Sequence, residues 1–253
     1  MDYDNKYGAL EIQRALLTLL KEFDEFCQKE KIRYSLSSGS LLGAVRHKGF
    51  IPWDDDLDCI MEREEFNKFC MVVNNHNILR IEHLTESSLW VERVRFRKIE
   101  YEGNYQPTLD LFVIDNCPDN VLIANFKILI IKVLQGMIKY HLNLKKGNWF
   151  MKLCTFVTFL LGRLFSHKKK YDWYTKVAQW GNGKPTEFMK IYHDQWHALN
   201  YRYPREIIQN IKRFSFEDTT VCGFVEYDKY LRIIYGDNYM TPPEEENRVP
   251  LHI

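Results

Sequence analysis

The sequence lacks the features that would assign it to several common protein classes. Its 35 lysines and arginines nearly cancel its 34 aspartates and glutamates, so a formal charge of +1 excludes the strongly basic surface typical of nucleic-acid-binding proteins. Its six cysteines form no CxxC motif and no paired metal-ligand spacing, which argues against structural zinc and indicates reduced thiols in a cytoplasmic protein. The N-terminus has acidic residues where a signal peptide has basic and apolar ones, so secretion is not expected.

The first 118 residues carry alternating helix and strand patterns. Apolar residues of segment 10–29 recur at helical spacing, which predicts an amphipathic helix. Further helices are expected to open at Ser40, an N-cap type of residue, and to cover 63–75. Strands are expected within 32–40, 56–61, 90–103 and 108–118. These elements predict an α+β (α/β-type) mixed sheet with flanking helices, and a 45% hydrophobic content is enough to build its core.

Beyond Pro118 the composition changes to long aromatic and aliphatic helices. They are expected at 121–142 and 148–174, so the chain divides into residues 1–118 and residues 119–253, a helical region with a C-terminal segment. The apolar part of the second helix, 149–165, is short for a bilayer span and is interrupted by Lys152 and Arg163. It predicts a buried helix or, alternatively, a surface helix on a membrane with the basic run 167–170 near anionic headgroups.

An acidic window, "IPWDDDLDCIM", carries the first chemical signal. If its end lies on a strand, Asp56 and Asp58 point to one face while Leu57 and Cys59 point into the core. Two carboxylates so placed suit a hard cation such as Mg²⁺, which takes oxygen ligands and retains waters for substrate phosphates. The plain alternative is a solvated acidic turn.

A calcium loop is a second alternative for the same window. Asp54, Asp56, Asp58 and Glu65 occupy positions 1, 3, 5 and 12 of an EF-hand pattern. However, Cys59 stands at the position that needs glycine, and a proline replaces the incoming helix, so this interpretation is disfavoured.

Other residues of this part of the chain favour magnesium and phosphate. Gly39 and Ser40 stand at an expected helix start, where backbone N–H groups and a hydroxyl can hold phosphate oxygens. Asp110, on its own expected strand, is a candidate third carboxylate. The candidate cations are Arg46, Lys48, Arg93, Arg95, Arg97 and Lys98. Together these residues outline a metal-dependent phosphoryl-transfer site.

The block "SSGSLLGAVRHKGFIPWDDDLDCIMEREEFNKF" closely resembles the signature of the LicD family, which includes phosphocholine transferases and fukutin-type relatives. The similarity extends to "RFRK", "LDLFVID" and the C-terminal "YLRIIYGDNYMTPP", and it omits the helical middle. It implies a nucleotidyltransferase fold of the DNA polymerase β type, in which Gly39 and Ser40 form the phosphate turn and Asp56, Asp58 and Asp110 are the acids. Ser38 stands where relatives often have another residue.

The resemblance implies transfer of a phospho-alcohol, phosphocholine first, from a CDP-activated donor to a hydroxyl of a glycan such as teichoic acid, lipopolysaccharide or a capsule precursor. CMP would leave, and Mg²⁺ or Mn²⁺ would be held by Asp56, Asp58 and Asp110 with Asp54 near them. Asp110 would also accept the acceptor's proton. The phosphate ligands would be Gly39, Ser40, Arg46, Lys48, Arg95, Arg97, Lys98 and His252.

Trp53 is the first candidate to receive a choline head through its ring, with Trp90 and Tyr105 as further candidates. The expected location is the cytoplasm, with contact to the inner face of the membrane as a variant, and nucleic acid is not an expected partner. Two other functions stay open at this point. One is a nucleotidyltransferase that releases pyrophosphate, and the other is a non-catalytic metal-binding relative.

Overall fold

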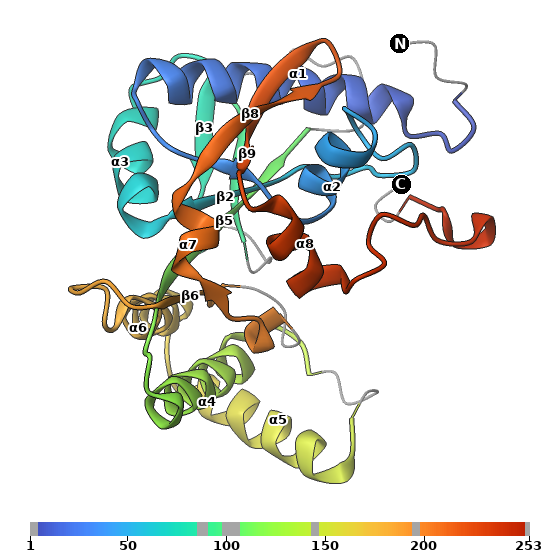
Figure 1. Cartoon of the computed structure of the whole chain (residues 1–253). Helices are drawn as coiled ribbons and strands as arrows, with labels where there is room; N and C mark the ends of the chain where they lie inside the picture. Colours follow the sequence, from blue (N-terminus) through green and yellow to red (C-terminus); the bar gives the residue numbers. More distant parts are fainter. Residues whose placement is uncertain (1–4, 85–90, 98–106, 143–146, 194–197, 251–253) are drawn as a thin grey trace. The chain divides into compact units, whose positions relative to one another are not determined.

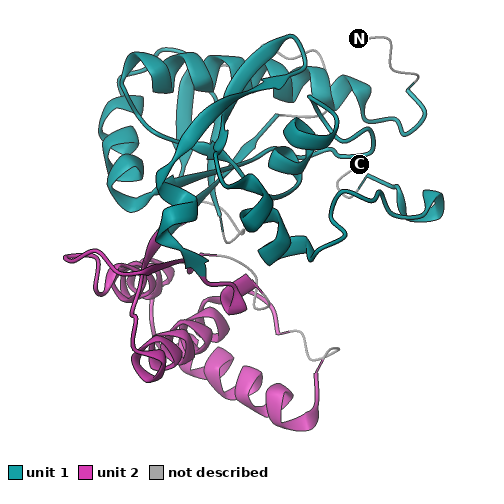
Figure 2. Cartoon of the chain, viewed as in Figure 1, with its two compact units in different colours: residues 1–82, 91–114, 203–253 teal, residues 83–90, 115–202 magenta. Residues whose placement is uncertain are grey.

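The computed structural model describes residues 5–84, 91–97, 107–142, 147–193 and 198–250. The chain forms two compact units (Figure 2). Unit 1 comprises residues 1–82, 91–114 and 203–253, and unit 2 comprises residues 83–90 and 115–202. The sequence-based division after residue 118 stays a prediction; the chain passes from unit 1 to unit 2 between residues 82 and 83 and again between residues 114 and 115. Residues 203–253, however, return to unit 1.

Unit 1 contains most of the strands. Its elements are α1 (Leu10–Lys29), β1 (Ser35–Leu36), α2 (Ser38–Arg46), β2 (Asp58–Glu62), α3 (Arg63–Val73), β3 (Leu79–Glu82), β4 (Glu92–Phe96), β5 (Leu109–Cys117, which continues into unit 2), β7 (Tyr203–Pro204), α7 (Arg205–Gln209), β8 (Ile211–Phe216), β9 (Thr219–Phe224), α8 (Tyr227–Tyr235) and a short 3-10 turn, Glu245–Asn247. Figure 1 shows these helices around the strands.

The sheet of unit 1 has the strand order β1-β2-β5-β4-β3. β2 and β5 are parallel, whereas β1 pairs β2, β4 pairs β5 and β3 pairs β4 in antiparallel fashion. The mixed sheet with flanking helices that the sequence predicted is therefore present. Apolar residues of α1 cover it, and the fully buried Phe23 contacts the rings of Tyr34 and Phe69. Burial of such aromatic side chains is a main source of the stability of this core.

Two element boundaries near the acidic window differ from expectation. Helix α2 begins at Ser38 with Ser37 as its N-cap, so Gly39 and Ser40 lie in its first turn rather than before it. Strand β2 begins at Asp58, so Asp56 precedes the strand and its direction does not follow from strand alternation. The expected strand start at Asp56 was wrong. The sequence "DLDC" fits a strand by composition, but pairing with β5 begins only at Asp58 and pairing with β1 only at Cys59.

The β8–β9 hairpin was not anticipated from the sequence. Its strands pair along their whole length, from Ile211 opposite Phe224 to Phe216 opposite Thr219. The turn residue Glu217 has a positive φ of 55°. The hairpin packs against α1, α2 and β1, which explains why the C-terminal segment belongs to unit 1.

Unit 2 is mainly helical. Its elements are α4 (Val121–Ile138), α5 (Trp149–Gly162), α6 (His167–Gln179), β6 (Phe188–Ile191) and the 3-10 turn Ala198–Asn200. Its core joins one face of α4, including Ile131 and Leu134, to Tyr171 and Tyr174 of α6. The single helix expected over 148–174 is two helices bent by 118°, because Gly162 ends α5 and the Ser166 hydroxyl caps the start of α6.

Candidate active site

Asp58 and Asp110 lie side by side on neighbouring parallel strands. Their Cα atoms are register partners of the β2–β5 pair, and the backbone N–H of Asp110 donates to the carbonyl of Leu57 at 2.8 Å. Their chain neighbours Cys59 and Leu111 are fully buried, whereas both aspartates are partly exposed. Because side chains alternate along a strand, the two carboxylates leave the sheet on the same face.

The loop before β2 holds Asp54 and Asp56. It is fixed from helix α1, because the buried Gln13 side chain donates to the carbonyls of Ile51 (3.0 Å) and Asp54 (2.8 Å). Burial, the charges of Asp56 and Asp55, and a hydrogen bond with Asp56 together raise the pKa of Asp54 from 3.8 to about 8. Carboxylates this crowded favour a shared proton or a bound cation.

The first turn of α2 lies directly against these acids. A Cβ at Gly39 would lie 2.8 Å from Asp54 Oδ2, so a larger residue there would have to displace the Asp54 carboxylate. The Ser40 hydroxyl is buried and accepts a hydrogen bond from the backbone N–H of Asp58 at 2.9 Å. Ser38 has a positive φ of 44°, a conformation that glycine adopts more easily. A phosphate-binding role for Gly39 and Ser40 stays a prediction.

The three arginines in residues 93–97 do not face a common partner. Arg93 is the register partner of Asp110, and its Nε lies 2.9 Å from Asp110 Oδ1. Arg95 instead pairs with Glu82 at 2.6 Å. Arg97 donates to backbone carbonyls of residues 73, 74 and 76 at the end of α3. Arg93 thus contacts a predicted catalytic acid, Arg95 contacts an acid of β3, and Arg97, just after β4, contacts backbone at the end of α3.

Arg46 is the other cation close to the acids. It donates to the carbonyl of Tyr239 at 3.1 Å. Burial lowers its pKa, while electrostatic interactions with Tyr235 and Asp54 raise it, which places all three groups within electrostatic reach. Lys48 is exposed, on a loop position with a φ of 58°. Lys98 and His252 lie outside the described residues.

Helix α8 contributes a tyrosine that the sequence did not single out. Although Tyr235 is 44% exposed as a whole, partial desolvation raises its pKa, and the charges of Asp58, Asp54 and Asp56 raise it further. The same helix carries the buried Tyr230, whose hydroxyl is hydrogen-bonded to that of Ser37 at 2.6 Å. In the sequence, only the resemblance of the segment "YLRIIYGDNYMTPP" to the LicD family could have indicated that this helix contributes to the site.

Trp53 lies in a small cluster of rings. Tyr7 and His47 contact it edge-on at 5.7 and 6.4 Å between ring centroids, and the guanidinium of Arg248 lies 5.2 Å from its ring centre. The Trp53 ring thus lies against the cation of Arg248, and its role in binding choline stays a prediction. Trp90 and Tyr105 lie outside the described residues.

The acidic side chains of the site are of a kind that binds hard cations. Carboxylate oxygens are the ligands that Mg²⁺ prefers, and Asp54, Asp56, Asp58 and Asp110 supply them. Among the described residues, however, no three His, Cys, Asp or Glu side chains are already arranged as metal ligands. Binding through three carboxylates therefore requires these side chains to rearrange, with Asp110 exchanging Arg93 for the cation.

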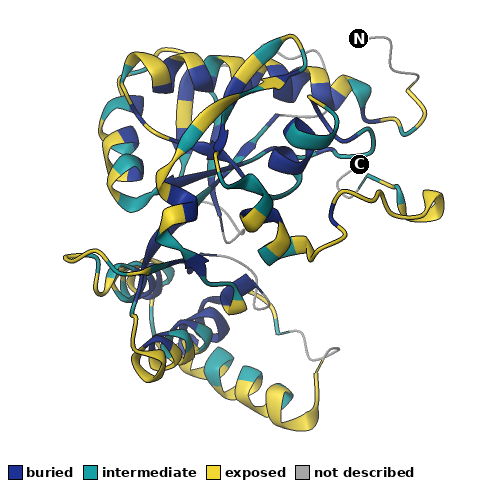
Figure 3. Cartoon of the chain, viewed as in Figure 1, coloured by how far each residue is buried: buried dark blue, intermediate teal, exposed yellow. Residues whose placement is uncertain are grey.

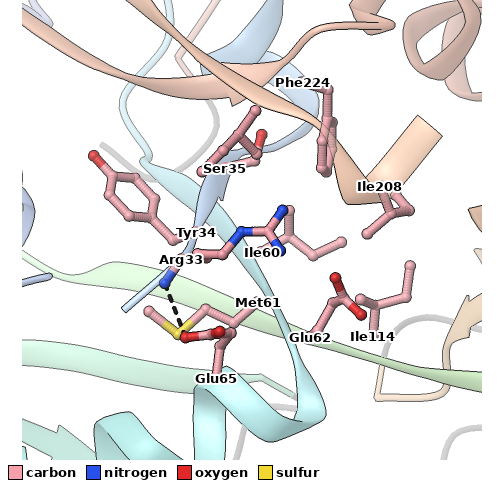
Figure 4. A pocket seen from close by; sticks show the side chains of 11 residues that line it. Arg33, Tyr34, Ser35, Ile60, Met61, Glu62, Glu65, Ile114, Ile208 and Phe224 are labelled. Atoms are coloured by element: carbon pink, nitrogen blue, oxygen red, sulfur yellow. Dashed lines mark hydrogen bonds between the residues drawn. The ribbon is translucent and has the colours of Figure 1, made fainter. Parts of the chain in front are cut away.

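A small pocket of unit 1 lies at the far end of β2 (Figure 4). It is lined by Met61 and Glu62 of β2, by Arg33, and by apolar residues such as Ile208 and Phe224. Burial raises the pKa of Glu62, while Arg205 and Arg33 lower it. Because Asp58 is at the opposite end of the strand, this pocket is separate from the carboxylates.

Comparison with known proteins decides the family. Residues 31–126 match the model described as LicD/FKTN/FKRP, nucleotidyltransferase domain. Residues 31–126 form a LicD/FKTN/FKRP nucleotidyltransferase domain. The LicD-family segment includes Asp56, Asp58 and Asp110, whereas Tyr235 lies outside it. The resemblance recognised in the sequence is thereby confirmed.

The relatives of this chain differ in how much of it they cover. The lipopolysaccharide cholinephosphotransferase LicD of Haemophilus influenzae is 28% identical over 264 residues, which span 96% of this chain and 95% of that protein. Uncharacterized proteins of Rickettsia prowazekii and Rickettsia typhi are each 50% identical over 54 residues, 21% of this chain and 20% and 18% of theirs.

Proposed function

We propose that the protein transfers phosphocholine, or a related phospho-alcohol, from a CDP-activated donor to a hydroxyl of a cell-surface glycan. The observation that carries this proposal is the register of Asp58 opposite Asp110 within a LicD-family domain. The full-length similarity to a lipopolysaccharide cholinephosphotransferase supports phosphocholine as the first donor to test. The polymerase β-like character of the fold is part of the same proposal.

In this proposal Asp56, Asp58 and Asp110, with Asp54 beside them, hold Mg²⁺ or Mn²⁺. The ion would neutralise negative charge on the donor diphosphate, as metal ions usually do in phosphoryl transfer. Burial and the neighbouring charges of Asp56 and Asp55 raise the pKa of Asp54, which supports this assignment because a bound cation would reduce the repulsion among these carboxylates.

The chain's own residues would perform the rest of the reaction. The acceptor hydroxyl oxygen forms a bond to the choline-bearing phosphorus, the bond from that phosphorus to the CMP oxygen breaks, and CMP leaves with the electron pair. Asp110 accepts the hydroxyl proton. Arg46 and Arg93 balance negative charge on the phosphates, since guanidinium groups bind phosphate oxygens well. Lys48 remains a candidate for the same task.

The experiment combines the purified protein with Mg²⁺, a glycan acceptor and, separately, CDP-choline, CDP-ethanolamine, CDP-glycerol or CDP-ribitol. Release of CMP together with labelled glycan is the expected result. Pyrophosphate released from a nucleoside triphosphate would instead indicate nucleotidyl transfer. Absence of CMP with all four donors, together with no Mg²⁺-dependent binding of any of them, would leave a non-catalytic relative.

A further inference from the structure

Helices α4 and α5 of unit 2 present an apolar surface that the described residues of this unit leave exposed. Leu122 and Phe126 of α4 are 79% and 55% exposed, and Trp149 of α5 and Leu164 just after it are 76% and 73% exposed. The other exposed apolar residues of this surface are Val121, Ile123, Leu129, Val133, Phe150, Met151, Leu153, Phe156, Val157, Leu160 and Leu161. Figure 3 shows exposed residues along both helices. A patch of this extent marks an interaction site.

The two helices pack closely enough to form one surface. A Cβ at Gly162 of α5 would lie 2.1 Å from the Met137 carbonyl of α4, and one at Gly136 would lie 2.1 Å from Thr158 Oγ1. Any larger residue at these glycines would force the helices apart. The exposed apolar side chains of α4 and α5 are therefore held together as a unit, which we call the α4/α5 surface.

This surface suits contact with a bilayer better than passage through one. Helix α4 is long and apolar enough to be a candidate span, but its other face is packed against α6 through Ile131 and Leu134. Its Lys127 is fully buried and donates to three backbone carbonyls of unit 2. Helix α5 has 14 residues, and at about 1.5 Å per residue it is shorter than the roughly 30 Å hydrocarbon core.

The charged residues of the segment that carries the α4/α5 surface are all cationic, and the exposed Asp119 and Asp172 lie just beyond its two ends. Residues 120–171 contain ten lysines and arginines and no aspartate or glutamate, although the whole chain is almost neutral. Arg163, Lys168 and Lys169 are exposed where α5 meets α6. We infer that the α4/α5 surface docks on a bilayer that contains anionic lipids, with its apolar residues among the acyl chains and these cations at the headgroups.

The same charge argues against a second copy of the chain as the occupant. Joining two α4/α5 surfaces would bring the exposed cations Arg163, Lys168 and Lys169 of two copies toward each other, and like charges repel. An anionic bilayer instead satisfies both the apolar and the basic residues. The inference concerns unit 2 alone and does not depend on the transfer reaction, so its test is separate from that of the proposed function.

The test is flotation of the purified full-length protein with vesicles of phosphatidylcholine alone or with added phosphatidylglycerol. We expect binding to the phosphatidylglycerol vesicles that is stronger at low salt, and little binding to phosphatidylcholine. Leu122→Gln combined with Phe126→Gln should lower the partition coefficient by about tenfold or more. Met71→Gln, at a residue of α3 that is 74% exposed, is the matched control and should bind like the wild type.

Charge is tested in the same assay. Lys168→Gln combined with Lys169→Gln should also lower partitioning by about tenfold or more, whereas the exposed pair Lys29→Gln and Lys212→Gln should not. Unchanged melting temperatures verify that the variants fold. Failure to float with anionic vesicles overturns the inference, as does equal binding to both lipids. A wild-type dimer that the Leu122→Gln and Phe126→Gln variant dissociates would assign the surface to a second copy and would overturn it too.

Discussion

Asp58 of β2 and Asp110 of β5 stand directly opposite each other in a parallel strand pair. Asp58→Asn and Asp110→Asn should each lower the transfer rate by about 10²-fold or more, because each removes a charged oxygen ligand from the reacting phosphates' environment. CMP release measures the rate. Asp218→Asn, at an exposed residue paired with Lys21, is the control that should keep full activity. Wild-type rates in Asp58→Asn would refute the assignment.

The ion pair between Arg93 and Asp110 predicts a change in cation affinity. Arg93→Met removes a positive charge 2.9 Å from the proposed ligand, so the variant should bind Mg²⁺ about tenfold more tightly. Isothermal titration calorimetry measures this affinity. Arg95→Met is the matched control, since Arg95 pairs with Glu82 and should leave the affinity unchanged. A weaker or equal affinity in Arg93→Met would mean that Asp110 is not a ligand.

The ring of Trp53 predicts how donors are discriminated. Because this ring already accepts the guanidinium of Arg248, it can accept the quaternary ammonium of choline in its place. Trp53→Leu should raise the KM for CDP-choline by about 3- to 30-fold and leave that for CDP-glycerol nearly unchanged. Trp180→Leu, at a partly exposed residue of unit 2, should alter neither. Equal losses for both donors would assign Trp53 to packing instead.

Lys190 of β6 predicts a pH dependence of stability. It is buried, donates to the carbonyl of Leu199 at 2.6 Å, and burial lowers its pKa from 10.5 to about 8. Between those pH values the unfolded chain binds more protons at this site than the folded chain, so the contribution of Lys190 to the free energy of unfolding rises with pH.

This contribution is measured by urea unfolding of the wild type and of Lys190→Met at several pH values. The difference in unfolding free energy, wild type minus variant, should increase on the order of 2 kcal/mol from pH 8 to 10.5. Other alkaline titrations cancel in the difference. A difference that stays constant across this range would show that Lys190 titrates normally in the folded protein.

The sequence predicted much of the site but not how its parts meet. A period of two places Arg93 and Arg95 on one face of their strand, yet only the pairing of β4 with β5 selects Arg93 as the partner of Asp110. Tyr235 was missed for a similar reason. It is far from the acids along the chain, and its place near them depends on packing between α2 and α8. Local patterns indicate faces and element types, whereas register and long-range packing are set by the whole fold.

Gln13 of α1 holds the backbone of the loop that carries Asp54, and Glu217 of the β8–β9 turn accepts a hydrogen bond from Phe50 at the other side of the same loop. Both supports lie outside residues 31–126, the segment that identifies the family. The segment that matches the family is thus shorter than unit 1, the compact unit in which its loop is held. A fragment limited to residues 31–126 would keep every proposed metal ligand but lose Gln13 and Glu217, whose hydrogen bonds hold the loop in place.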